Sequence, residues 1–495
     1  MLYMPPTARH TIKPRTAAAS NQRKAESFQC RRLHFVGIGG CGMSGLARLL
    51  AQLGADCSGS DQTTSPTTAA LEDHGIAISL DDGSSSCLTK PITNVDEVII
   101  SAAIPDNHPS VQAAKEQGIA VTTYAEMLGR VQMGRLGVSI AGTHGKSTTT
   151  AMLCHILLDC NLDPSFIIGA TCPQTGGGSR VSHSRKEHDD ILICEACEFN
   201  RSFHDHRPTI GLINNLEEDH LDIYGSLEAI VEAFRGFAEL LPSSVDGGML
   251  LIAHEDAHRN AVTPGLSCTV ETFGFNPEAT YQVVYDTSVQ RVGLLSNGTW
   301  ICQWTNQMPG AHNALNAAAA VILAHRLGAD WEEAATAMSQ FEGLDRRTNL
   351  LGTRPVPNGH VTVYDDYGHH PTEIEKTLRA IRSVHDPSRL ICVFQPHQHS
   401  RTRFLLEHFA QSFSLADEVI VPEIYFVRDS EIERHKISAR DLVDRLRDRG
   451  VKAQHLYPFD AIVEYLTTTT HAGELVVIMG AGPVDQVAHD FLKAP

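Results

Sequence analysis

The sequence predicts an α/β protein made of several domains, each built around a parallel sheet. The chain has 495 residues, which is more than a single hydrophobic core usually holds. From Arg32 onward, short apolar runs alternate with segments whose apolar residues recur at helical spacing, a pattern typical of stacked βα units. Three blocks each open on an apolar strand followed by a turn, so we expect domains at residues 32–134, 135–342 and 343–495.

Composition and charge narrow the class of protein. Hydrophobic residues make up 42% of the chain and charged residues 20%, as in ordinary soluble globular proteins. No apolar run reaches the length of a membrane span, and the formal net charge of −18 gives no general attraction to nucleic acid or to a membrane. The twelve cysteines are scattered and favour a reducing compartment. We therefore expect a cytoplasmic monomer or homodimer with no nucleic-acid partner and no membrane partner.

The first residues differ in composition from the rest of the chain. Residues 1–31 are rich in Ala, Thr, Lys and Arg and lack the apolar centre of a secretory signal. We expect this segment to be a disordered tail. Two alternatives stay open, translation that starts at Met4 and an organellar transit peptide.

The first block contains a glycine-rich turn between a strand and a helix. A strand expected at residues 33–36 leads into GIGGCG at residues 37–42, and a helical pattern follows. The turn matches a dinucleotide-binding fingerprint, with an acid at the distance where ribose would be bound. Because glycines let the backbone approach any diphosphate, an NAD site, a site for another nucleotide diphosphate such as UDP, and a turn without a ligand all remain open. The candidate contacts are Gly37, Gly39, Gly40, Gly42, Met43 and Asp61.

The second block carries a loop that predicts phosphate binding. An apolar strand at residues 137–140 precedes GTHGKS at residues 142–147, and an amphipathic helix follows. The loop lacks the first glycine of the standard spacing, but its lysine can reach β- and γ-phosphates and its serine can bind Mg²⁺. Chance matches to GKS are common, whereas one between a strand and a helix favours a nucleotide site. The candidate ATP contacts are Gly142, Thr143, His144, Gly145, Lys146, Ser147 and Thr148.

Polar residues at later strand ends supply candidate metal ligands. Glu195 follows an apolar strand at residues 191–194, and His220 ends the run NNLEEDH that follows the next strand. Such positions beside a phosphate loop are well placed for Mg²⁺. The alternatives are a solvent-facing Glu195 with Glu198 as the inward acid, and a purely structural His220.

The rest of the second block and its boundary add further candidates. His312 and Asn313 open a helix after Pro-Gly and can contact a nucleotide, with helix capping by the asparagine as the alternative. Arg347, in a DRR run, can close onto a phosphate when domains approach, unless the arginine pair is a solvated linker. Residues 269–304 predict short strands that form an antiparallel ribbon beside the main sheet.

The third block alternates four apolar strands with amphipathic segments. Two histidine-rich runs leave its strands, DDYGHHPTE at residues 365–373 and FQPHQHSRT at residues 394–402. Open α/β sheets bind ligands at the carboxyl ends of their strands, so both runs are candidate substrate contacts. Within the first run, Thr372 is the expected cap of the next helix, with Glu375 at the matching acid position.

Eight motifs, taken in their order along the chain, resemble those of the Mur ligase family. They are GIGGCGMSG, GTHGKS, EACEFNRSF, NNLEEDHLD, GAHNALNA, DRR, DDYGHHPTE and FQPHQHSRT, and the resemblance runs from about residue 32 to the C-terminus. It implies the three-domain Mur ligase architecture. A Rossmann-like N-terminal domain would bind a UDP-linked substrate, a P-loop ATPase-like central domain would bind Mg-ATP, and a Rossmann-like C-terminal domain would carry the amino-acid site.

The last two motifs are the most specific. They resemble those of the members that join L-alanine to the lactyl carboxylate of UDP-N-acetylmuramate through an acyl phosphate, a step of peptidoglycan precursor biosynthesis that uses ATP and Mg²⁺. By motif position, the resemblance implies that Ser147 and Glu195 hold one Mg²⁺ and His220 a second. The implied ATP contacts are Lys146, His312, Asn313 and Arg347, and the implied alanine contacts are Tyr367, His397 and Arg401.

The chain departs from the family pattern near one of these residues. Cys197 stands where Asp is frequent, and Phe199-Asn200 where Ser-Asp is frequent, which leaves Glu195 itself in place. Three other interpretations stay open: a related recycling ligase that attaches a peptide in place of alanine, an NAD-dependent oxidoreductase, and a nucleotide sensor without catalysis.

Overall fold

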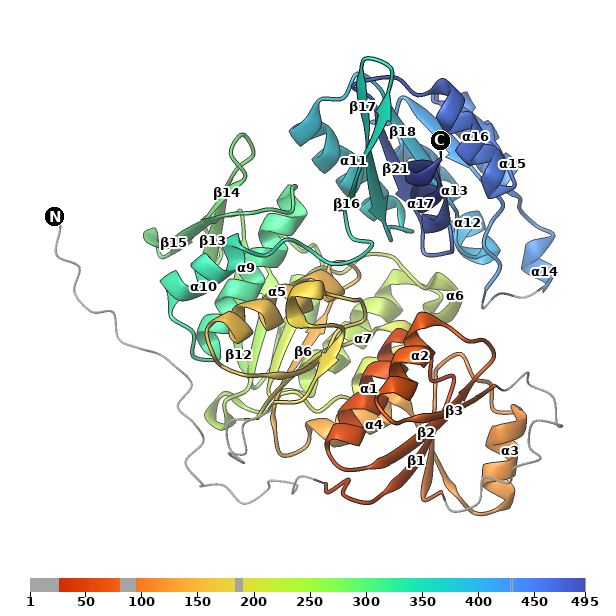
Figure 1. Cartoon of the computed structure of the whole chain (residues 1–495). Coiled ribbons are helices and arrows are strands. Elements are labelled where there is room, and N and C mark those ends of the chain that lie inside the picture. Colours follow the sequence, from red (N-terminus) through yellow and green to blue (C-terminus); the bar gives the residue numbers. More distant parts are fainter. Residues whose placement is uncertain (1–25, 81–94, 183–189, 428, 430, 495) are drawn as a thin grey trace.

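The chain folds into three sheets, each flanked by helices (Figure 1). The computed structural model describes residues 26–80, 95–182, 190–427, 429 and 431–494. The N-terminal sheet lies at the lower right of Figure 1, the central sheet at the left and the C-terminal sheet at the upper right. The α/β class expected from the sequence is confirmed. None of the helices in these described ranges is long and apolar enough to cross a bilayer.

The N-terminal sheet has five parallel strands in the order β3-β2-β1-β4-β5. The chain runs outward from β1 in both directions, so the carboxyl end of β1 is the switch point where open α/β sheets bind ligands. The strands are β1 (Arg32–Val36), β2 (Asp56–Asp61), β3 (Ala77–Leu80), β4 (Glu97–Ile100) and β5 (Ala120–Thr123). The helices are α1 (Cys41–Gln52), α2 (Pro66–Asp73), α3 (Pro109–Glu116) and α4 (Tyr124–Gln132).

Residues 26–31, expected to end a disordered tail, instead pack against this domain. Phe28 is 2% exposed and joins the core that contains the apolar face of α1. Glu26 pairs with Arg31 at 2.6 Å and with Arg130 at 2.5 Å. A single buried aromatic residue leaves no periodic pattern in a sequence, so the composition of residues 1–31 did not indicate that Phe28 is buried. The residues before Glu26 lie outside the described part of the chain.

The central sheet has ten strands in the order β15-β14-β13-β12-β11-β10-β6-β9-β7-β8. β6 pairs in parallel with β10 on one side and β9 on the other, so the loops that leave these three strands converge. Its parallel part comprises β6 (Leu136–Ala141), β7 (Ser165–Ile167), β9 (Ile191–Glu195), β10 (Ile210–Ile213), β11 (Met249–Ala253) and β12 (Thr269–Gly274), and β8 (Ser179–Arg180) pairs antiparallel with β7.

Helices cover both faces of the central sheet. One core contains α5 (Lys146–Asp159), α9 (Ala311–Arg326) and α10 (Trp331–Ser339), and the opposite core contains α7 (Leu227–Glu239). The shorter helices are α6 (Leu221–Tyr224) and α8 (Arg259–Val262). Single 3-10 turns span Pro173–Thr175 and Ser244–Asp246, and Phe199–Asp205 is a 3-10 segment with a kink at Asn200 and Arg201. α5 packs against α9, which fixes the phosphate loop at the start of α5 beside the start of α9.

The predicted antiparallel ribbon exists, but it extends the main sheet and does not lie beside it. β13 (Tyr281–Asp286), β14 (Arg291–Ser296) and β15 (Thr299–Thr305) pair antiparallel, as expected from the Ser-Asn-Gly turn. β12, however, pairs in parallel with both β11 and β13, and so joins the ribbon to the sheet. Alternation alone does not reveal which neighbour an outer strand takes.

The C-terminal sheet has six strands in the order β16-β17-β21-β18-β19-β20. β17 and β18 both pair in parallel with β21, so the two histidine-rich runs that follow them emerge at the same edge. The strands are β16 (Asn349–Val356), β17 (Gly359–Asp366), β18 (Leu390–Phe394), β19 (Glu418–Val421), β20 (Lys452–His455) and β21 (Leu475–Met479). The helices are α11 (Pro371–His385), α12 (His399–Phe404), α13 (Leu406–Ser412), α14 (Glu431–Arg434), α15 (Ala439–Asp448), α16 (Phe459–Thr469) and α17 (Asp485–Lys493).

Candidate functional site

The phosphate loop needs its glycines for space and for backbone geometry. Gly142 has φ 140° and a side chain there would meet Asn214, while Gly145 has φ 80° and a side chain there would lie 2.6 Å from Asn316 Oδ1. Both backbone conformations strongly favour glycine. The loop is therefore pressed between the segment after β10 and the second turn of α9.

Only part of the loop is free to cradle phosphate. Thr143 donates its N–H to Asn215 O at 3.0 Å, and His144 donates its N–H to Asn215 Oδ1 at 2.8 Å. Helix α5 begins at Lys146, and the N–H groups of a helix's first turn have no partner inside the helix. The N–H groups of Lys146, Ser147 and Thr148, at the start of α5, are therefore placed to bind an anion, while Thr143 and His144 brace the loop.

Lys146 is held by a carboxylate that sequence reasoning left as an alternative. Its Nζ lies 2.8 Å and 3.1 Å from the two oxygens of Glu198 and donates to Gly142 O and Thr143 O. Burial lowers the pKa of Lys146, but Glu198 outweighs this effect and raises it. Lys146 thus carries a full positive charge at the point where phosphate oxygens would arrive.

Two groups of candidate metal ligands flank Lys146. Ser147 Oγ donates to Glu195 Oε2 at 3.0 Å, as expected for two ligands of one ion, and burial raises the pKa of Glu195. On the other side, ligand atoms of Glu198, Asp219 and His220 lie within 4.8 Å of one another. Burial also lowers the pKa of His220, against the effect of Asp219, which favours the neutral imidazole that binds metals. Oxygen donors with one imidazole fit Mg²⁺.

A cavity of about 340 Å³ opens from the loop toward the C-terminal domain. Its lining includes His312 and Asn313, as expected for nucleotide contacts, and Phe273, Met308 and Leu315 form an apolar side that suits a base. Burial and the nearby Lys376 lower the pKa of His312 to about 3, so this histidine is neutral.

Asn313 lies in the first turn of α9 but does not cap this helix. Gly310 holds the cap position of α9 with φ 103°, and Asn313 Nδ2 donates to Pro309 O at 2.9 Å. The side chain is 2% exposed, and its Oδ1 accepts from Asn316 Nδ2. The amide pair Asn313–Asn316 lies in the wall of the cavity, and contact of Asn313 with a nucleotide stays a prediction.

The two arginines of the DRR run have different roles. Arg346 donates to Gly480 O and Gly482 O and lies 3.4 Å from Asp365, so it is fixed inside the C-terminal domain. Arg347 lines the cavity, with Nη1 3.6 Å from Glu373 Oε1. Only the second arginine of the pair is placed to reach a phosphate.

The three predicted alanine contacts lie along one wall of the C-terminal domain. His369 stands between Tyr367, at a ring distance of 5.5 Å, and His397, at 5.7 Å. Arg401 Nη2 donates to Asp219 Oδ1 of the central domain at 2.9 Å. Glu407, an acid on the helix that follows Arg401, pairs among the described residues with Arg445 and Arg449 and not with Arg401. Arg401 therefore bridges the C-terminal wall and the metal-ligand cluster.

The glycine turn of the N-terminal domain uses its acid internally. Asp61 Oδ2 accepts the N–H of Gly39 at 2.8 Å, so the predicted ribose-binding carboxylate braces the turn. Gly37 has φ 78°, and a side chain on Gly42 would lie 3.0 Å from the ring of Tyr124. Gly40 caps α1, and Met43 is buried in the core below it. The turn leaves the switch point of the sheet, as a diphosphate site requires.

Several site residues escaped sequence reasoning. His370 and Glu373 form the capping box of α11, where Thr372 and Glu375 were expected, because the helix begins two residues earlier than predicted. Thr372 Oγ1 instead donates to Glu217 Oε2 at 2.6 Å, across the domain boundary. Thr372 lies in DDYGHHPTE and Glu217 in NNLEEDHLD, but nothing in the sequence indicates that these two motifs are in contact.

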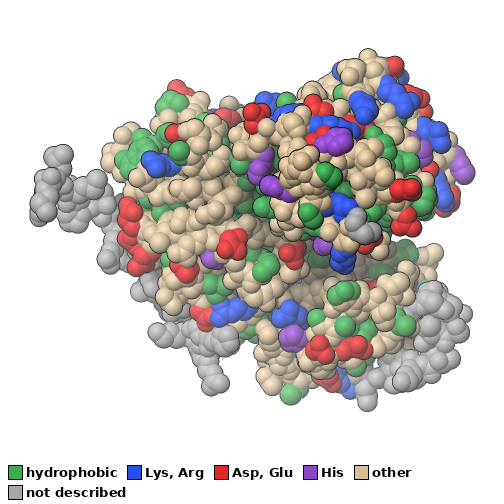
Figure 2. Space-filling model, turned by 45° about the horizontal axis from the view of Figure 1, so that its top comes forward, with side chains coloured by type: hydrophobic (Ala, Val, Ile, Leu, Met, Phe, Trp, Pro, Cys, Tyr) green, Lys and Arg blue, Asp and Glu red, His purple; other side chains and the backbone are tan. Residues whose placement is uncertain are grey.

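A phosphate loop beside carboxylate and histidine ligands, facing a cavity that the C-terminal domain closes, defines a nucleotide-dependent α/β enzyme. Figure 2 shows basic and histidine side chains around the hollow between the upper lobe and the rest of the molecule. Three family descriptions match the chain in order: "Mur ligase family, catalytic domain" at residues 32–133, "Mur ligase middle domain" at 140–324 and "Mur ligase, glutamate ligase domain" at 346–482. The chain belongs to the Mur ligase family.

Curated relatives and solved structures agree with this assignment. The chain is 37% identical to a UDP-N-acetylmuramate–L-alanine ligase of Caldanaerobacter subterraneus subsp. tengcongensis over 94% of its own length and 97% of that protein. It is 36% identical to the protein of the same name from Clostridium novyi, over 94% and 98%. Among solved structures, the UDP-N-acetylmuramate–alanine ligase of Thermotoga maritima matches with a TM-score of 0.73 at 26% identity, covering 93% of this chain and 98% of that one.

The recycling alternative also has a structural counterpart. A murein peptide ligase from Psychrobacter arcticus matches with a TM-score of 0.71 at 25% identity and covers 94% of this chain and 98% of that one. The fold alone therefore hardly distinguishes an alanine ligase from a murein peptide ligase. The curated relatives at 36–37% identity carry the alanine-ligase name.

Proposed function

We propose that this enzyme uses ATP to join L-alanine to the lactyl carboxylate of UDP-N-acetylmuramate, a cytoplasmic step of peptidoglycan precursor biosynthesis. The relatives that carry this name span nearly the whole chain. The observation that supports it most strongly is the convergence of GTHGKS, NNLEEDH and DDYGHHPTE on one cavity.

The chemistry proposed for the first step is attack of the lactyl carboxylate on the γ-phosphorus of ATP, which releases ADP and leaves an acyl phosphate. Lys146 exchanges Glu198 for phosphate oxygens, and the N–H groups at the start of α5 hold the remaining charge. Ser147 and Glu195 would hold one Mg²⁺ and His220 a second, and these ions would supply further charge neutralisation. Arg347 closes on the phosphates from the C-terminal domain.

In the second step, the neutral amine of L-alanine attacks the acyl carbon, and phosphate leaves. The N–H groups of Arg401 that do not bind Asp219 receive the alanine carboxylate, and Tyr367 and His397 limit the room for its side chain. His312 and Asn313 contact the nucleotide at the cavity wall. Positioning and electrostatics account for the rate in this scheme, and no side chain forms a covalent bond.

The N-terminal turn is proposed to bind the diphosphate of the UDP-linked substrate. Gly37, Gly39, Gly40 and Gly42 let the backbone approach it, and α1 points its N-terminus at the same place. Met43 lies in the first turn of α1, and Asp61 holds the turn in shape through Gly39. The domain limits near residues 134 and 342, and a monomeric or homodimeric state, belong to the same proposal.

A phosphate-release assay tests the function. The purified enzyme is given UDP-N-acetylmuramate, ATP and Mg²⁺ with L-alanine, glycine, L-serine or the tripeptide of the recycling reaction in turn. We expect release that requires the UDP-linked substrate and is fastest with L-alanine. Faster release with the tripeptide would assign the recycling activity, and release that ignores the UDP-linked substrate would remove both.

A further inference from the structure

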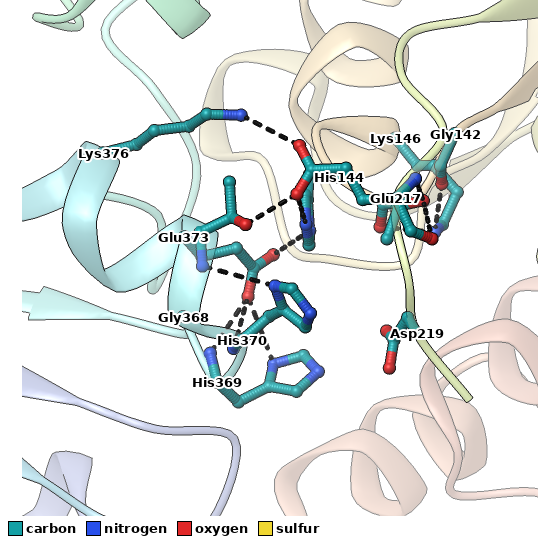
Figure 3. A network of polar contacts seen from close by, with 12 residues as sticks. Gly142, His144, Lys146, Glu217, Asp219, Gly368, His369, His370, Glu373 and Lys376 are labelled. Carbon is teal, nitrogen blue, oxygen red and sulfur yellow. Dashed lines mark hydrogen bonds and ion pairs between the residues drawn. The ribbon is translucent and has the colours of Figure 1, made fainter. Parts of the chain in front are cut away.

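His144 belongs to the phosphate loop, and its side chain lies between Glu217 and Glu373, the second of which belongs to the C-terminal domain (Figure 3). Its Nδ1 lies 3.3 Å from Glu373 Oε1, and its Nε2 lies 3.5 Å from Glu217 Oε2. The imidazole packs against the ring of His370 at 4.7 Å. The side chain is about nine-tenths buried, so these contacts form in a space from which water is largely excluded.

The two carboxylates come from different domains, and each is held in place. Glu373 accepts N–H groups of His369 at 3.0 Å and His370 at 3.2 Å, which fixes it at the start of α11. Glu217, from the central domain, accepts from Thr372 and lies 3.5 Å from Lys376, both on α11. His144 thus sits in the middle of a contact that joins α11 to the central domain.

The charges in this contact are consistent with an imidazolium. Burial lowers the pKa of His144, but Glu217 and Glu373 outweigh burial and raise it to about 9. Burial likewise opposes the shift at Glu373, yet His369 and His144 hold its pKa well below the usual range. The titratable groups that contact His144 are Glu217, Glu373 and His370. Around them, Arg347 pairs with Glu373, Lys376 pairs with Glu217, and His312 is close enough to feel the charge of His144.

A metal ion is a weaker explanation for the same cluster. Ligand atoms of His144, Glu217 and His370 lie within 4.8 Å of one another. Both nitrogens of His370 already have partners, because Nδ1 accepts the N–H of Thr372 at 3.3 Å and Nε2 lies 3.0 Å from Glu218 O. The cation between the two carboxylates is therefore His144 itself.

We propose that His144 is a positioning residue that couples docking of the C-terminal domain to the shape of the phosphate loop. The main chain of His144 is bound by Asn215, and Lys146 follows two residues later. The attraction between Glu373 and the imidazolium of His144 therefore acts on the loop segment that positions Lys146. The proposal rests on the ligase function above, since docking brings the amino-acid wall to the acyl phosphate.

The test compares Glu373→Gln and His144→Gln with Glu375→Gln in alanine-dependent phosphate release. Glu375 lies on the same helix, is exposed and pairs with Arg379, so it is a matched control. We expect the first two variants to lose about tenfold in kcat/KM for L-alanine, with the KM for UDP-N-acetylmuramate unchanged. Because the two residues act through one contact, the double variant should lose no more than either single variant.

The proposal would be overturned if the loss of kcat/KM in the double variant equalled the product of the two single losses. It would also be overturned if the two single variants kept the same kcat/KM as Glu375→Gln. Melting curves separate a local effect from unfolding, and if His144→Gln does not fold, Glu373→Gln against its control still decides. A purely structural role predicts a lower melting temperature with an unchanged kcat/KM for alanine, which also overturns it. Failure of the wild type and Glu375→Gln to release phosphate with alanine would instead refute the ligase function.

Discussion

Replacing Arg401 with lysine should raise the KM for L-alanine by about tenfold to a hundredfold, because a charge-assisted hydrogen bond contributes about 1.5–3 kcal/mol. Arg401 is 8% exposed, and one terminal nitrogen already donates to Asp219 at 2.9 Å. The planar fork of arginine can serve this carboxylate and the substrate carboxylate together. A lysine ammonium keeps the charge but lacks that geometry. The KM for ATP should change by no more than about threefold, because Arg401 lies outside the nucleotide cavity.

The ion pair with Asp219 adds a structural effect that a second variant separates. Burial raises the pKa of Asp219, but Arg401 outweighs it and holds that pKa well below the usual range. Arg401→Met would leave this carboxylate buried without its partner, which costs about 3–5 kcal/mol of stability. Adding Asp219→Asn removes the stranded charge, so the melting temperature should recover. The KM for alanine should stay raised, because neither change restores the fork.

The assay varies L-alanine at saturating ATP and UDP-N-acetylmuramate, with a melting curve for each variant. Arg403→Lys is the matched control, since Arg403 lies on the same helix and pairs with Glu433 near the surface. It should leave the KM for alanine unchanged. The reasoning fails if folded Arg401→Lys keeps the wild-type KM, or if the Arg401→Met/Asp219→Asn pair restores it.

Four further predictions concern the loop, the metal, the N-terminus and pH. Lys146→Ala should lower alanine-dependent phosphate release at least about a thousandfold while the melting curve stays close to the wild type, since the lysine acts as a charge on phosphate. Glu195→Ala and His220→Ala should each shift the curve of activity against Mg²⁺ concentration to higher values, and two unshifted curves would refute these ligands. Deleting residues 1–25 should keep activity within about threefold, whereas deletion through residue 31 should cost about 1.5–3 kcal/mol, measured by denaturant unfolding, because it removes a buried aromatic ring. The pKa of His144 is raised from 6.5 to about 9, so its stabilisation is complete below 6.5 and is lost as the pH rises through 9; the wild-type melting temperature should fall more across this window than that of His144→Gln.

The phosphate loop was predictable because its parts are consecutive. Strand β6, the two glycines and the start of α5 follow one another, so spacing alone places Lys146 and Ser147. Thr143 and His144 were predicted as ATP contacts by the same spacing, and this stays a prediction, although their N–H groups already bind Asn215. The competing acceptor, Asn215, follows a different strand, β10, and only the order β10-β6-β9 brings it beside the loop.

Arg346 and Arg347 show more clearly that residues next to each other in the sequence need not have side chains in the same place. The sequence predicts Arg347 as the phosphate contact, and in the structure the side chains of the two arginines diverge toward different partners. Arg346 has φ 60°, a left-handed conformation, and its side chain turns back to Asp365. Arg347 then points to Glu373 and the cavity. A single turn of the backbone decides which arginine faces the cavity, and no residue pattern in DRR encodes that turn.

The carboxylates beside the phosphate loop make nucleotide binding an exchange of partners. Lys146 faces Glu198, and His144 faces Glu217 and Glu373, so neither cation lacks a negative neighbour before phosphate arrives. A polyphosphate must compete with these acids in a partly buried site, where like charges repel more strongly than in water. Divalent cations that enter with the nucleotide supply the positive charge that this competition lacks. The number of acids around the loop therefore favours a nucleotide that arrives with divalent cations, and Glu198 competes with phosphate for Lys146.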